Sequence, residues 1–404
     1  MEETFLKIIN RPLYVDRIKP YIGQNIIKLL TGQRRVGKSY ILKKVAQYIK
    51  QKDYNANIIF INLEEFAFSH ITDAQGLYEE LRPRLKENRQ NHIFIDEIQE
   101  VHEFDRLLRS LILDEKNDIY ITGSNSSMLS SEMASRLAGR NIEIRVHPLS
   151  FEEFLTFHNM ENDENSLNSY LRYGGMPYLR NLPEKATWNE YLSGLTNTIV
   201  YRDIVGRYNI RNIDFLQRLL LFVSDNIGRL FTAKRISDYL KSQKIANSVS
   251  GVLNYMGYIE NTYIVNKSSR WDIEGKRYFE IGEKYYFEDL GIRNSLVGYR
   301  PQDLAALIEN AVYNHLRIKN YNVKTGVLSG GKEIDFVAER GNEFKYIQVA
   351  LSITDRSTEE REFGNLEKIP DNYEKLVVTL NESYPNTYKG IKCLSLLQFL
   401  TDFK

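Results

Sequence analysis

The chain has 404 residues, a length that corresponds to two or three domains and excludes a single small binding module. Lys and Arg total 54 and Asp and Glu total 53, so the net charge is +1 and no field of the whole molecule directs it toward nucleic acid or an anionic membrane. With 42% apolar and 26% charged residues, the composition is typical of a globular protein and excludes a disordered one.

Targeting and redox features are few. No run of 18 apolar residues occurs, and the first residues, MEETFLKIINRPLYVDRI, lack the basic end and apolar stretch of a signal peptide. The single cysteine, Cys393, excludes an internal disulfide and a multi-cysteine zinc site, and the histidines show no paired-ligand spacing. We therefore expect a cytoplasmic protein with no membrane partner and no zinc.

The first 150 residues alternate short apolar runs with helical patterns. Strands are predicted at 25–31, 58–63, 92–95, 118–123 and 141–147, with helices at 38–52, 73–87 and 101–113. This alternation indicates a parallel sheet covered on both faces. The pattern changes at Pro148-Leu149-Ser150, where Ser150 is predicted to cap a helix that begins FEEFL, so we expect a sheet domain over 1–150.

The rest of the chain divides into three further predicted parts. Residues 151–210 have helical patterns interrupted by YGGMP at 173–177, and we expect a helical lid there. Helices at 213–224, 232–242 and 247–258, followed by strands at 259–265 and 284–287, predict a winged helix over 211–295. A separate α/β domain is predicted over 296–404, with helices near 304–315 and 359–369 and strands at 322–328, 333–338, 344–351 and 375–380.

A nucleotide-binding motif stands between the first strand and the first helix. Its sequence, Gly32-Gln33-Arg34-Arg35-Val36-Gly37-Lys38-Ser39, fits G-x-x-x-x-G-K-[S/T] at every fixed position. Backbone N–H groups of such a loop, and the positive end of the following helix, converge on phosphate oxygens. We expect this loop and Tyr40 to bind ATP, with Lys38 on the β and γ oxygens and the Ser39 hydroxyl as a ligand of Mg²⁺.

Polar residues follow two of the later predicted strands. Asp96 comes directly after the strand at 92–95, where it would hold Mg²⁺, and Glu97 next to it would orient and polarise the attacking water. Asn125 follows the strand at 118–123 and is predicted to hold that water against the γ-phosphate. Its neighbour Ser124 competes for this role, and a turn asparagine is the alternative.

Two arginines in SRLAGRN, Arg136 and Arg140, are candidates for an arginine finger that reaches the γ-phosphate of an adjacent subunit. A finger of this kind would require a homo-oligomer. A plain surface or structural arginine is the alternative for each of them.

These motifs resemble those of a known family. Residues 25–147 resemble an AAA-type ATPase module through TGQRRVGKSYIL, HIFIDEIQE and YITGSNSSML. The segments SRLAGRNIEIRVHPLSFEEF, YGGMPYL and YRDIVGRYNI are similar to those of prokaryotic ATPases that couple such a module to an additional C-terminal domain. In that family the C-terminal part is similar to PD-(D/E)XK nucleases, so the resemblance implies a restriction-endonuclease-like fold for 296–404.

A nuclease of that fold needs a strand aspartate, a second acidic residue or glutamine on the next strand, and a lysine two residues later. Asp335 in KEIDFVAE and Glu309 in LIENAVYNHL fit the acidic positions, and Gln348 takes the second. Ala350 stands where the lysine belongs. We therefore expect a catalytically degenerate domain, unless Lys332 or Lys345 reaches the site from elsewhere.

The predicted winged helix gives a mixed indication for DNA. Its third helix, NSVSGVLNYMGY, offers only Asn247 and Asn254 for base edges and carries no cation. The following ribbon has four cations and three acidic residues: Lys267, Arg270, Lys276, Arg277, Asp272, Glu274 and Glu280. Phosphate contact by the ribbon and use of the winged helix as a lid or subunit contact both remain open.

We therefore expect an α/β protein: a P-loop AAA-type parallel sheet with a helical lid, then a winged helix and a restriction-endonuclease-like domain. The predicted function is that of a Mg²⁺-dependent ATPase that acts as a nucleotide-driven conformational switch, with ATP and Mg²⁺ as cofactors and DNA as a candidate partner. One alternative is an ATP-regulated DNA-processing nuclease. The other is a non-cutting, nucleotide-dependent DNA-binding or scaffold protein.

Overall fold

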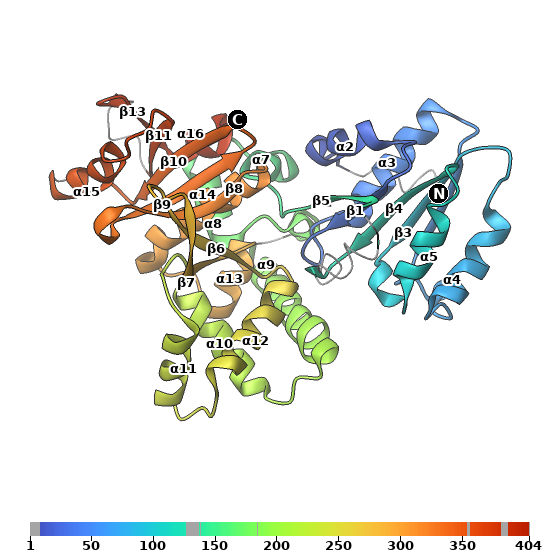
Figure 1. The fold of residues 1–404 in the computed structure, drawn as a ribbon, viewed down its shortest axis with the longest axis horizontal. Helices are drawn as coiled ribbons and strands as arrows, with labels where there is room; N and C mark the ends of the chain where they lie inside the picture. Colours follow the sequence, from blue (N-terminus) through green and yellow to red (C-terminus); the bar gives the residue numbers. More distant parts are fainter. Residues whose placement is uncertain are drawn as a thin grey trace. The chain divides into compact units, whose positions relative to one another are not determined.

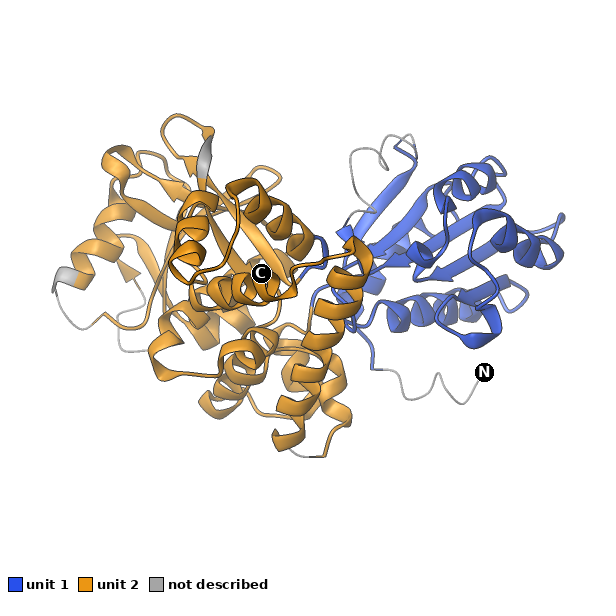
Figure 2. Cartoon of the chain, turned by 90° about the horizontal axis from the view of Figure 1, so that it is seen from below, with its two compact units in different colours: residues 1–147, 261–263 blue, residues 148–260, 264–404 orange. Residues whose placement is uncertain are grey.

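The computed structural model describes residues 9–126, 137, 139–183, 185–353, 356–380 and 387–403 (Figure 1). The chain forms two compact units, residues 1–147 with 261–263 and residues 148–260 with 264–404 (Figure 2). Each unit contains its own β-sheet. Within the described ranges, no helix combines the length and the apolar character needed to cross a membrane.

The first unit is built on a five-stranded parallel sheet with the order β2-β3-β4-β1-β5. Its strands are β1 (Ile27–Thr31), β2 (Asn57–Asn62), β3 (Asn91–Asp96), β4 (Asn117–Gly123) and β5 (Asn141–Arg145). Its helices are α2 (Pro12–Ile18), α3 (Lys38–Lys52), α4 (Ala74–Leu81) and α5 (Phe104–Leu111). The predicted parallel sheet is confirmed, whereas α2 was not predicted.

Helices cover both faces of this sheet (Figure 1). Right-handed crossovers place α3 on one face and α4 and α5 on the other, because the chain reverses its direction of travel across the sheet after β2. The central strands β1, β3 and β4 are buried along their whole length, and each contains a short apolar run: Leu29–Leu30, Ile93–Ile95 and Ile119–Ile121. Helix α4 ends at Leu81 rather than at residue 87, because Pro83 has no N–H to continue the helix and the chain goes on as a 3₁₀ turn over Arg82–Arg84.

A buried charge cluster fixes β1 against β4 near the amino-terminal ends of these strands. Lys28 and Asp118 form an ion pair in which both side chains are fully buried. Asp118 Oδ2 also lies 2.7 Å from His92 Nδ1, and it accepts hydrogen bonds from the Tyr120 hydroxyl (2.7 Å) and from Gly23 N (3.0 Å). Burial acts to raise the pKa of Asp118, but these partners outweigh it and the pKa lies below its usual value.

The strand register brings the predicted nucleotide-binding residues to the opposite edge. Thr31, the last residue of β1, pairs with Gly123 of β4 and with Arg145 of β5. Asp96 ends β3, which pairs with β4 in parallel. The loop after β1 and the residues after β3 and β4 therefore meet at the carboxyl edge of one sheet.

The second unit contains helices before, between and after the strands of its sheet. They are α7 (Phe151–His158), α8 (Glu164–Tyr173), α9 (Lys185–Thr198), a π-helical turn (Ile199–Gly206), α10 (Ile213–Asp225), α11 (Ala233–Ser242), α12 (Val249–Asn261), α13 (Leu290–Val297), α14 (Leu304–Ile318), α15 (Arg356–Glu367) and α16 (Leu396–Asp402). Ser150 caps α7 as predicted, in a capping box with Glu153. Thr232 likewise caps α11.

The second sheet has eight strands in the order β12-β13-β11-β10-β9-β8-β6-β7. The strands are β6 (Val265–Asp272), β7 (Arg277–Phe287), β8 (Asn322–Val327), β9 (Glu333–Arg340), β10 (Glu343–Ala350), β11 (Glu374–Thr379), β12 (Thr387–Tyr388) and β13 (Ile391–Ser395). The β6–β7 ribbon joins this sheet because β6 pairs in parallel with β8. The sheet therefore crosses the predicted boundary between 211–295 and 296–404.

One predicted strand in this region is wrong. Residues 259–261 belong to α12, and β6 starts only at Val265. Val252, Met256 and Ile259 are buried on one face of α12 at helical spacing, which extends the helix into the segment predicted as a strand. The winged-helix and restriction-endonuclease-like interpretations stay predictions.

The YGGMP segment is explained by a buried carboxylate. Asp289, the N-cap of α13, accepts hydrogen bonds from Gly175 N (2.7 Å) and Ile292 N (3.0 Å). Gly174 has φ +71°, and a Cβ placed there would lie 2.3 Å from Asp289 Oδ1. The two glycines therefore allow the chain after α8 to fold closely around Asp289.

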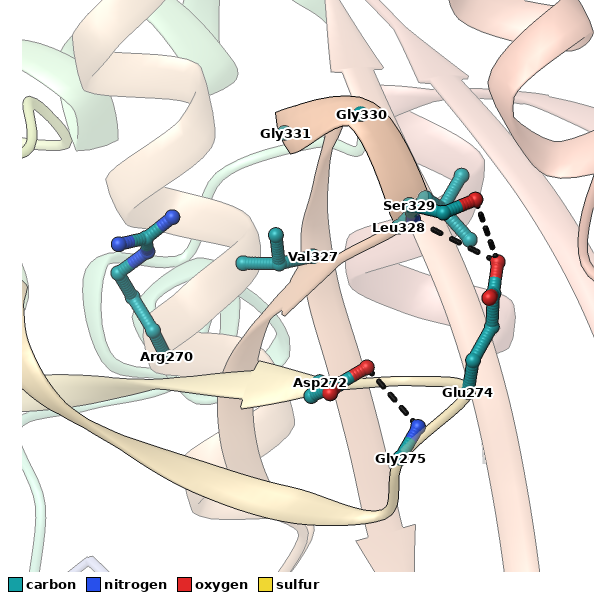
Figure 3. A pocket seen from close by; sticks show the side chains of 9 residues that line it. All are labelled: Arg270, Asp272, Glu274, Gly275, Val327, Leu328, Ser329, Gly330 and Gly331. Atoms are coloured by element: carbon teal, nitrogen blue, oxygen red, sulfur yellow. Dashed lines mark hydrogen bonds between the residues drawn. The ribbon is translucent and has the colours of Figure 1, made fainter.

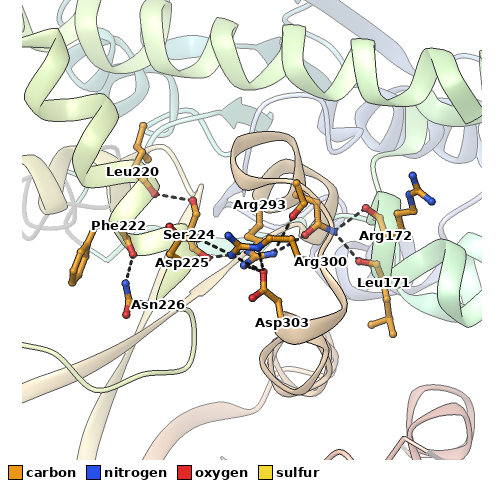
Figure 4. A network of polar contacts seen from close by, with 12 residues as sticks. Leu171, Arg172, Leu220, Phe222, Ser224, Asp225, Asn226, Arg293, Arg300 and Asp303 are labelled. Atoms are coloured by element: carbon orange, nitrogen blue, oxygen red, sulfur yellow. Dashed lines mark hydrogen bonds and ion pairs between the residues drawn. The ribbon is translucent and has the colours of Figure 1, made fainter.

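A second polar network joins the helices of this unit around Arg293, whose side chain is almost fully buried (Figure 4). Arg293 donates to the carbonyl of Ser224 at the end of α10 (3.0 Å) and to Asp303 before α14 (2.6 Å). Asp303 also accepts from Arg300, and the next residue of α13, Asn294, donates to the carbonyls of Leu171 and Arg172 in α8. Helices α8, α10, α13 and the start of α14 are therefore fixed to one another by hydrogen bonds.

Asp289 predicts a distinct pH dependence. Burial raises its pKa to about 6, although backbone N–H groups oppose the shift. Since the folded pKa exceeds the usual unfolded value of about 3.9, the fold favours the protonated form, and the free energy of unfolding falls as pH rises from about 4 to about 6. The Asp289→Asn variant is expected to lack this decrease.

The measurement is urea unfolding from pH 3.5 to 7, followed by tryptophan fluorescence. Both tryptophans, Trp188 and Trp271, lie in the second unit, so the signal reports that unit alone. The difference between wild type and variant isolates Asp289 from other titrating groups. Parallel pH curves for the two proteins would contradict the assignment.

Candidate nucleotide-binding site

The loop after β1 is held close to the end of β5. Val146 N donates a hydrogen bond to Thr31 O (2.7 Å). Gly32 follows with φ +137°, and a Cβ placed there would lie 2.1 Å from Val146 O, so a side chain has no room at this position. Gly37, with φ +99°, is the N-cap from which α3 begins at Lys38.

The amino-terminal end of α3 fits an anion. No side chain caps this helix, and its first turn contains no acidic residue. The first N–H groups of a helix have no partner within the helix, and the helix dipole is positive at this end. Because the loop and Lys38 stand directly at this end, the local structure fits a phosphate group.

Lys38 is buried at the centre of the site. Its Nζ donates to Gly32 O (2.9 Å) and Gln33 O (3.1 Å) and lies 3.8 Å from Glu97 Oε1. The ammonium group is therefore located between the phosphate-binding loop and the residues that follow β3. In this position it can contact phosphate oxygens by exchanging its backbone acceptors for them.

Other loop residues differ in their surroundings. The Gln33 side chain is fully buried, and neither of its amide atoms forms a hydrogen bond with another described residue, so the loop contains an unsatisfied buried amide. Arg34 is buried and pairs with Glu64, which follows β2 (2.9 Å). Arg35 and Tyr40 are exposed.

Thr122, near the end of β4, positions both carboxylates after β3. Its hydroxyl donates to Asp96 Oδ1 (2.6 Å) and accepts from Glu97 N (2.8 Å). Glu97 has φ +57°, a left-handed conformation that turns the chain away from the strand. One hydroxyl therefore determines where Asp96 lies and supports the turn that directs Glu97 into the site.

Asp96 and Ser39, the two predicted ligands of Mg²⁺, contact each other through a side-chain hydrogen bond. Burial raises the pKa of Asp96, and side-chain hydrogen bonds with Ser39 and Thr122 partly oppose this. Within the described ranges, no group of three or more His, Cys, Asp or Glu side chains is arranged to hold a metal ion. Mg²⁺ would therefore take its remaining ligands from phosphate and water, which is the usual arrangement for this ion.

Glu97 is buried but held in its charged form. Burial acts to raise its pKa, yet the charges of Lys38 and Arg34 and hydrogen bonds from Gln99 and Ser124 outweigh burial and lower the pKa. Ser124 Oγ donates to Glu97 Oε2 at 3.0 Å, and Gln99 contacts the same oxygen. Ser124, the alternative to Asn125 for holding the water, is thus hydrogen-bonded to this carboxylate.

The remaining predicted residues are Asn125, Arg140 and Arg136. Asn125 is buried directly after Ser124. Arg140 is exposed and precedes β5, whose first residue pairs with the first residue of β1. It therefore stands at the amino-terminal edge of the sheet, about 16 Å of strand away from its own P-loop. Arg136 lies outside the described residues.

Two residues of this site were missed by the sequence analysis. Thr122 is one, and Arg11 is the other. Arg11 is buried and donates to Val36 O in the loop (2.8 Å) and to His147 O after β5 (3.0 Å). It thus connects the segment before α2 to the phosphate-binding loop. A lone arginine before a proline gave no indication of this contact.

The acidic residues predicted from the nuclease resemblance also come together, in the second unit. Glu309 on α14 and Asp335 on β9 both face the ammonium group of Lys284 on β7, at 3.2 and 3.7 Å. Neither predicted lysine joins them: Lys345 pairs with Glu343 and Glu374, and Lys332 is exposed. The sequence analysis missed Lys284 because it lies far from the signature in the chain.

The second unit also contains a cavity of about 410 Å³ between the ribbon and the β8–β9 turn (Figure 3). Arg270, Asp272 and Glu274 give it mixed charge. Asp272 accepts from Gly275 N (2.9 Å) and Glu274 from Ser329 Oγ (2.9 Å), so its acidic groups are already engaged. This cavity therefore provides no clear binding chemistry.

Two family models match the chain: an AAA domain over residues 24–155 and a domain of unknown function, DUF8612, over residues 164–303. An uncharacterized protein of Haemophilus influenzae is 32% identical over 401 residues, which cover 97% of this chain and 98% of that protein. An uncharacterized protein of Methanocaldococcus jannaschii is 29% identical over 396 residues, which cover 93% of this chain and 86% of that protein.

Solved structures give weaker similarity. The Aeropyrum pernix ORC2 protein aligns with 78% of this chain and 93% of its own, at 11% identity and a TM-score of 0.39. DnaA from Aquifex aeolicus, bound to AMPPCP, aligns with 52% of this chain and 67% of its own, at 18% identity and a TM-score of 0.29. These values are too low to carry a functional argument.

Proposed function

Since the chain belongs to the same family as the Haemophilus influenzae protein and carries an AAA domain at residues 24–155, we propose that it is a Mg²⁺-dependent ATPase. Binding and hydrolysis of ATP would switch its conformation. The observation that carries this proposal is the meeting of Lys38, Ser39, Asp96 and Glu97 at one edge of a parallel sheet.

Each of these residues has a distinct task. The first N–H groups of α3 and the Lys38 ammonium bind the phosphate oxygens, and Ser39 and Asp96 supply protein ligands for Mg²⁺. The metal neutralises charge on the transferred phosphoryl group when it is bound. Glu97, charged because its pKa is lowered, accepts a hydrogen bond from the attacking water and orients it.

The contacts of Lys38 suggest how nucleotide binding acts as a switch. Lys38 helps to hold Glu97 in its charged form, together with Gln99 and Ser124. When the Lys38 ammonium group contacts phosphate oxygens instead, its attraction for the Glu97 carboxylate becomes weaker. Occupation of the loop would therefore change the position of the carboxylate that prepares water.

Assembly would complete the site. Arg140 lies at the edge of the sheet opposite its own P-loop, so it serves only a neighbouring subunit if it contacts a γ-phosphate. Arg136, in the same segment, remains the other candidate. We propose a homo-oligomer in which one of these arginines acts in trans.

A second candidate function, contact with nucleic acid, is favoured by the charges around α11. Five cations are exposed on this helix and its flanking turns: Arg229, Lys234, Arg235, Lys241 and Lys244. Asp238 is the only acidic residue in the sequence from position 226 to position 258. Among the described residues, none of the five cations forms an ion pair, so they are available to phosphate groups.

The ribbon is a weaker candidate for phosphate contact. Lys267 pairs with Glu283 (3.0 Å) and Arg277 with Asp272 (3.3 Å). Much of the predicted ribbon charge is therefore neutralised within the chain. A contact made by α11 would be to the phosphate backbone and independent of base sequence.

The catalytic assignment predicts different effects for two substitutions. Lys38→Ala removes a buried charge-assisted contact and is expected to weaken ATP binding about 100-fold. Glu97→Gln is expected to keep ATP binding and to lower kcat roughly 100- to 10,000-fold. Calorimetry with ATP and Mg²⁺ and a phosphate-release assay measure the two quantities. Lys44→Ala, on the same helix, is the matched control. Equal loss of ATP binding and turnover in Glu97→Gln would contradict the role of Glu97 in orienting the attacking water.

The trans arginine predicts complementation between inactive variants. Lys38→Ala lacks a working loop but keeps its arginines, whereas Arg140→Ala keeps its loop. Each variant alone is expected to be nearly inactive, and a mixture should regain part of the ATPase rate. In mixed interfaces the intact loop of Arg140→Ala faces the intact arginine of Lys38→Ala. Full turnover by an assembled Arg136→Ala/Arg140→Ala protein would refute the trans finger.

The nucleic-acid proposal predicts a change in salt dependence. Wild type is expected to bind duplex DNA with log Kd rising linearly with log salt, and Lys241→Ala/Lys244→Ala should make this slope about 2 units less steep. The ribbon variant Lys276→Ala/Arg277→Ala is the matched control and should change the slope little. Fluorescence anisotropy between 50 and 200 mM salt measures both. An unchanged slope in the α11 variant would exclude this surface.

A further inference from the structure

Lys284 sits inside a group of acidic side chains. Its side chain is buried on β7, and its Nζ lies 3.2 Å from Glu309 Oε1, 3.7 Å from Asp335 Oδ1 and in contact with Glu333. The three carboxylates come from α14 and β9, elements distant from β7 in the sequence. The Tyr286 hydroxyl, two residues from Lys284, also donates to Glu309 Oε1 (2.7 Å).

The other polar groups near Asp335 are used within the protein. Asp335 Oδ2 accepts from Val349 N (2.8 Å), and Asp335 N donates to Gln348 Oε1 (2.7 Å). The Gln348 amide then donates to Glu362 Oε2 (2.9 Å). Gln348 occupies a metal-ligand position in the nuclease signature, but its side-chain oxygen already accepts a hydrogen bond from the backbone of Asp335. Ala350 has no polar side-chain group.

The turn between α10 and α11 lies against the same cluster. Gly228 N donates to Tyr285 O on β7 (3.2 Å). A Cβ placed on Gly228 would lie 3.0 Å from Glu309 Oε1, so the backbone of the turn directly adjoins this carboxylate. Glu309 is 17% exposed and Asp335 is 16% exposed, so little of either group faces solvent.

We propose that the Lys284 ammonium is the resident cation of this cluster, a tethered substitute for a divalent metal ion. Three carboxylates in one place, of which Glu309 and Asp335 are largely buried and Glu333 is more exposed, repel one another and require a counter-charge. Lys284 supplies it from a strand fixed in the same sheet as Asp335. The second unit therefore keeps acidic side chains around a positive charge, but this charge belongs to Lys284, and the wild-type protein binds no metal there.

Charge balance supports the proposal. Burial and the neighbouring Glu309 raise the pKa of Asp335 to about 8, although Lys284 opposes the shift. The direction of this shift agrees with acidic groups that repel one another and with Lys284 as the group that offsets their charge. Within the described residues, no arrangement of acidic side chains suited to a metal is present, which agrees with this view.

The first test titrates Mn²⁺ into the nucleotide-free full chain and measures bound ion by electron paramagnetic resonance. Wild type is expected to show no binding that depends on Asp335. Lys284→Met is expected to gain a Mn²⁺ site, and Lys284→Met/Asp335→Asn to lose it again. Mn²⁺ bound by wild type and released by Asp335→Asn would overturn the proposal, as would plasmid cleavage with Mg²⁺ or Mn²⁺ that Asp335→Ala abolishes.

The second test uses thermal unfolding, followed by tryptophan fluorescence. Lys284→Met leaves buried charges without their partner and is expected to lower Tm by roughly 5–10 °C, and adding Asp335→Asn should restore at least half of the loss. Lys345→Met is the matched control: it removes another buried, carboxylate-bound lysine, and Asp335→Asn should not rescue it. An unchanged Tm in Lys284→Met, or equal rescue of both variants, would overturn the proposal. The wild-type titration remains decisive if Lys284→Met does not fold.

Discussion

The close packing of Gly32 against the carbonyl of Val146 is the constraint on which the nucleotide site depends. It fixes the start of the phosphate-binding loop to the end of β5, while Arg11 holds Val36 later in the same loop. With both parts of the loop anchored, α3 can begin at Lys38 with its uncapped end directed toward the site. A larger residue in place of Gly32 would push the loop away from Val146 and change its position relative to Asp96 and Glu97.

The sequence was sufficient for the parts of the site that are local in the chain. The loop motif and the Asp-Glu pair after an apolar strand identify their own surroundings, and β1, α3 and β3 form where they were expected. Thr122 and Arg11 could not be predicted in the same way, because their roles arise from strand pairing and from a contact across 25 residues of sequence. Lys284 reaches Asp335 only because the ribbon joins the second sheet.

The same reason explains what went wrong in the second unit. Short apolar segments such as IENTYIV are ambiguous between helix and strand, and burial of Ile259 on the face of α12 decided the outcome. The sequence analysis placed the ribbon and the C-terminal strands in separate domains because they are far apart in the chain. In the structure β6 and β8 pair across 50 intervening residues or more. Two polar networks, around Asp289 and Arg293, then join helices that the sequence presents as unrelated segments.

The assignment of residues 261–263 to the first unit has a practical consequence for dissecting the protein. Asn261 accepts a hydrogen bond from Ser126, directly after Asn125, and Tyr263 lies under the guanidinium group of Arg145 at the end of β5. The chain therefore passes between the units three times, and a cut after residue 147 would leave residues 261–263 of the first unit on the other fragment. A fragment that stops at residue 147 would lack a piece of its own fold, so loss of a property in such a truncation would say nothing about the full chain.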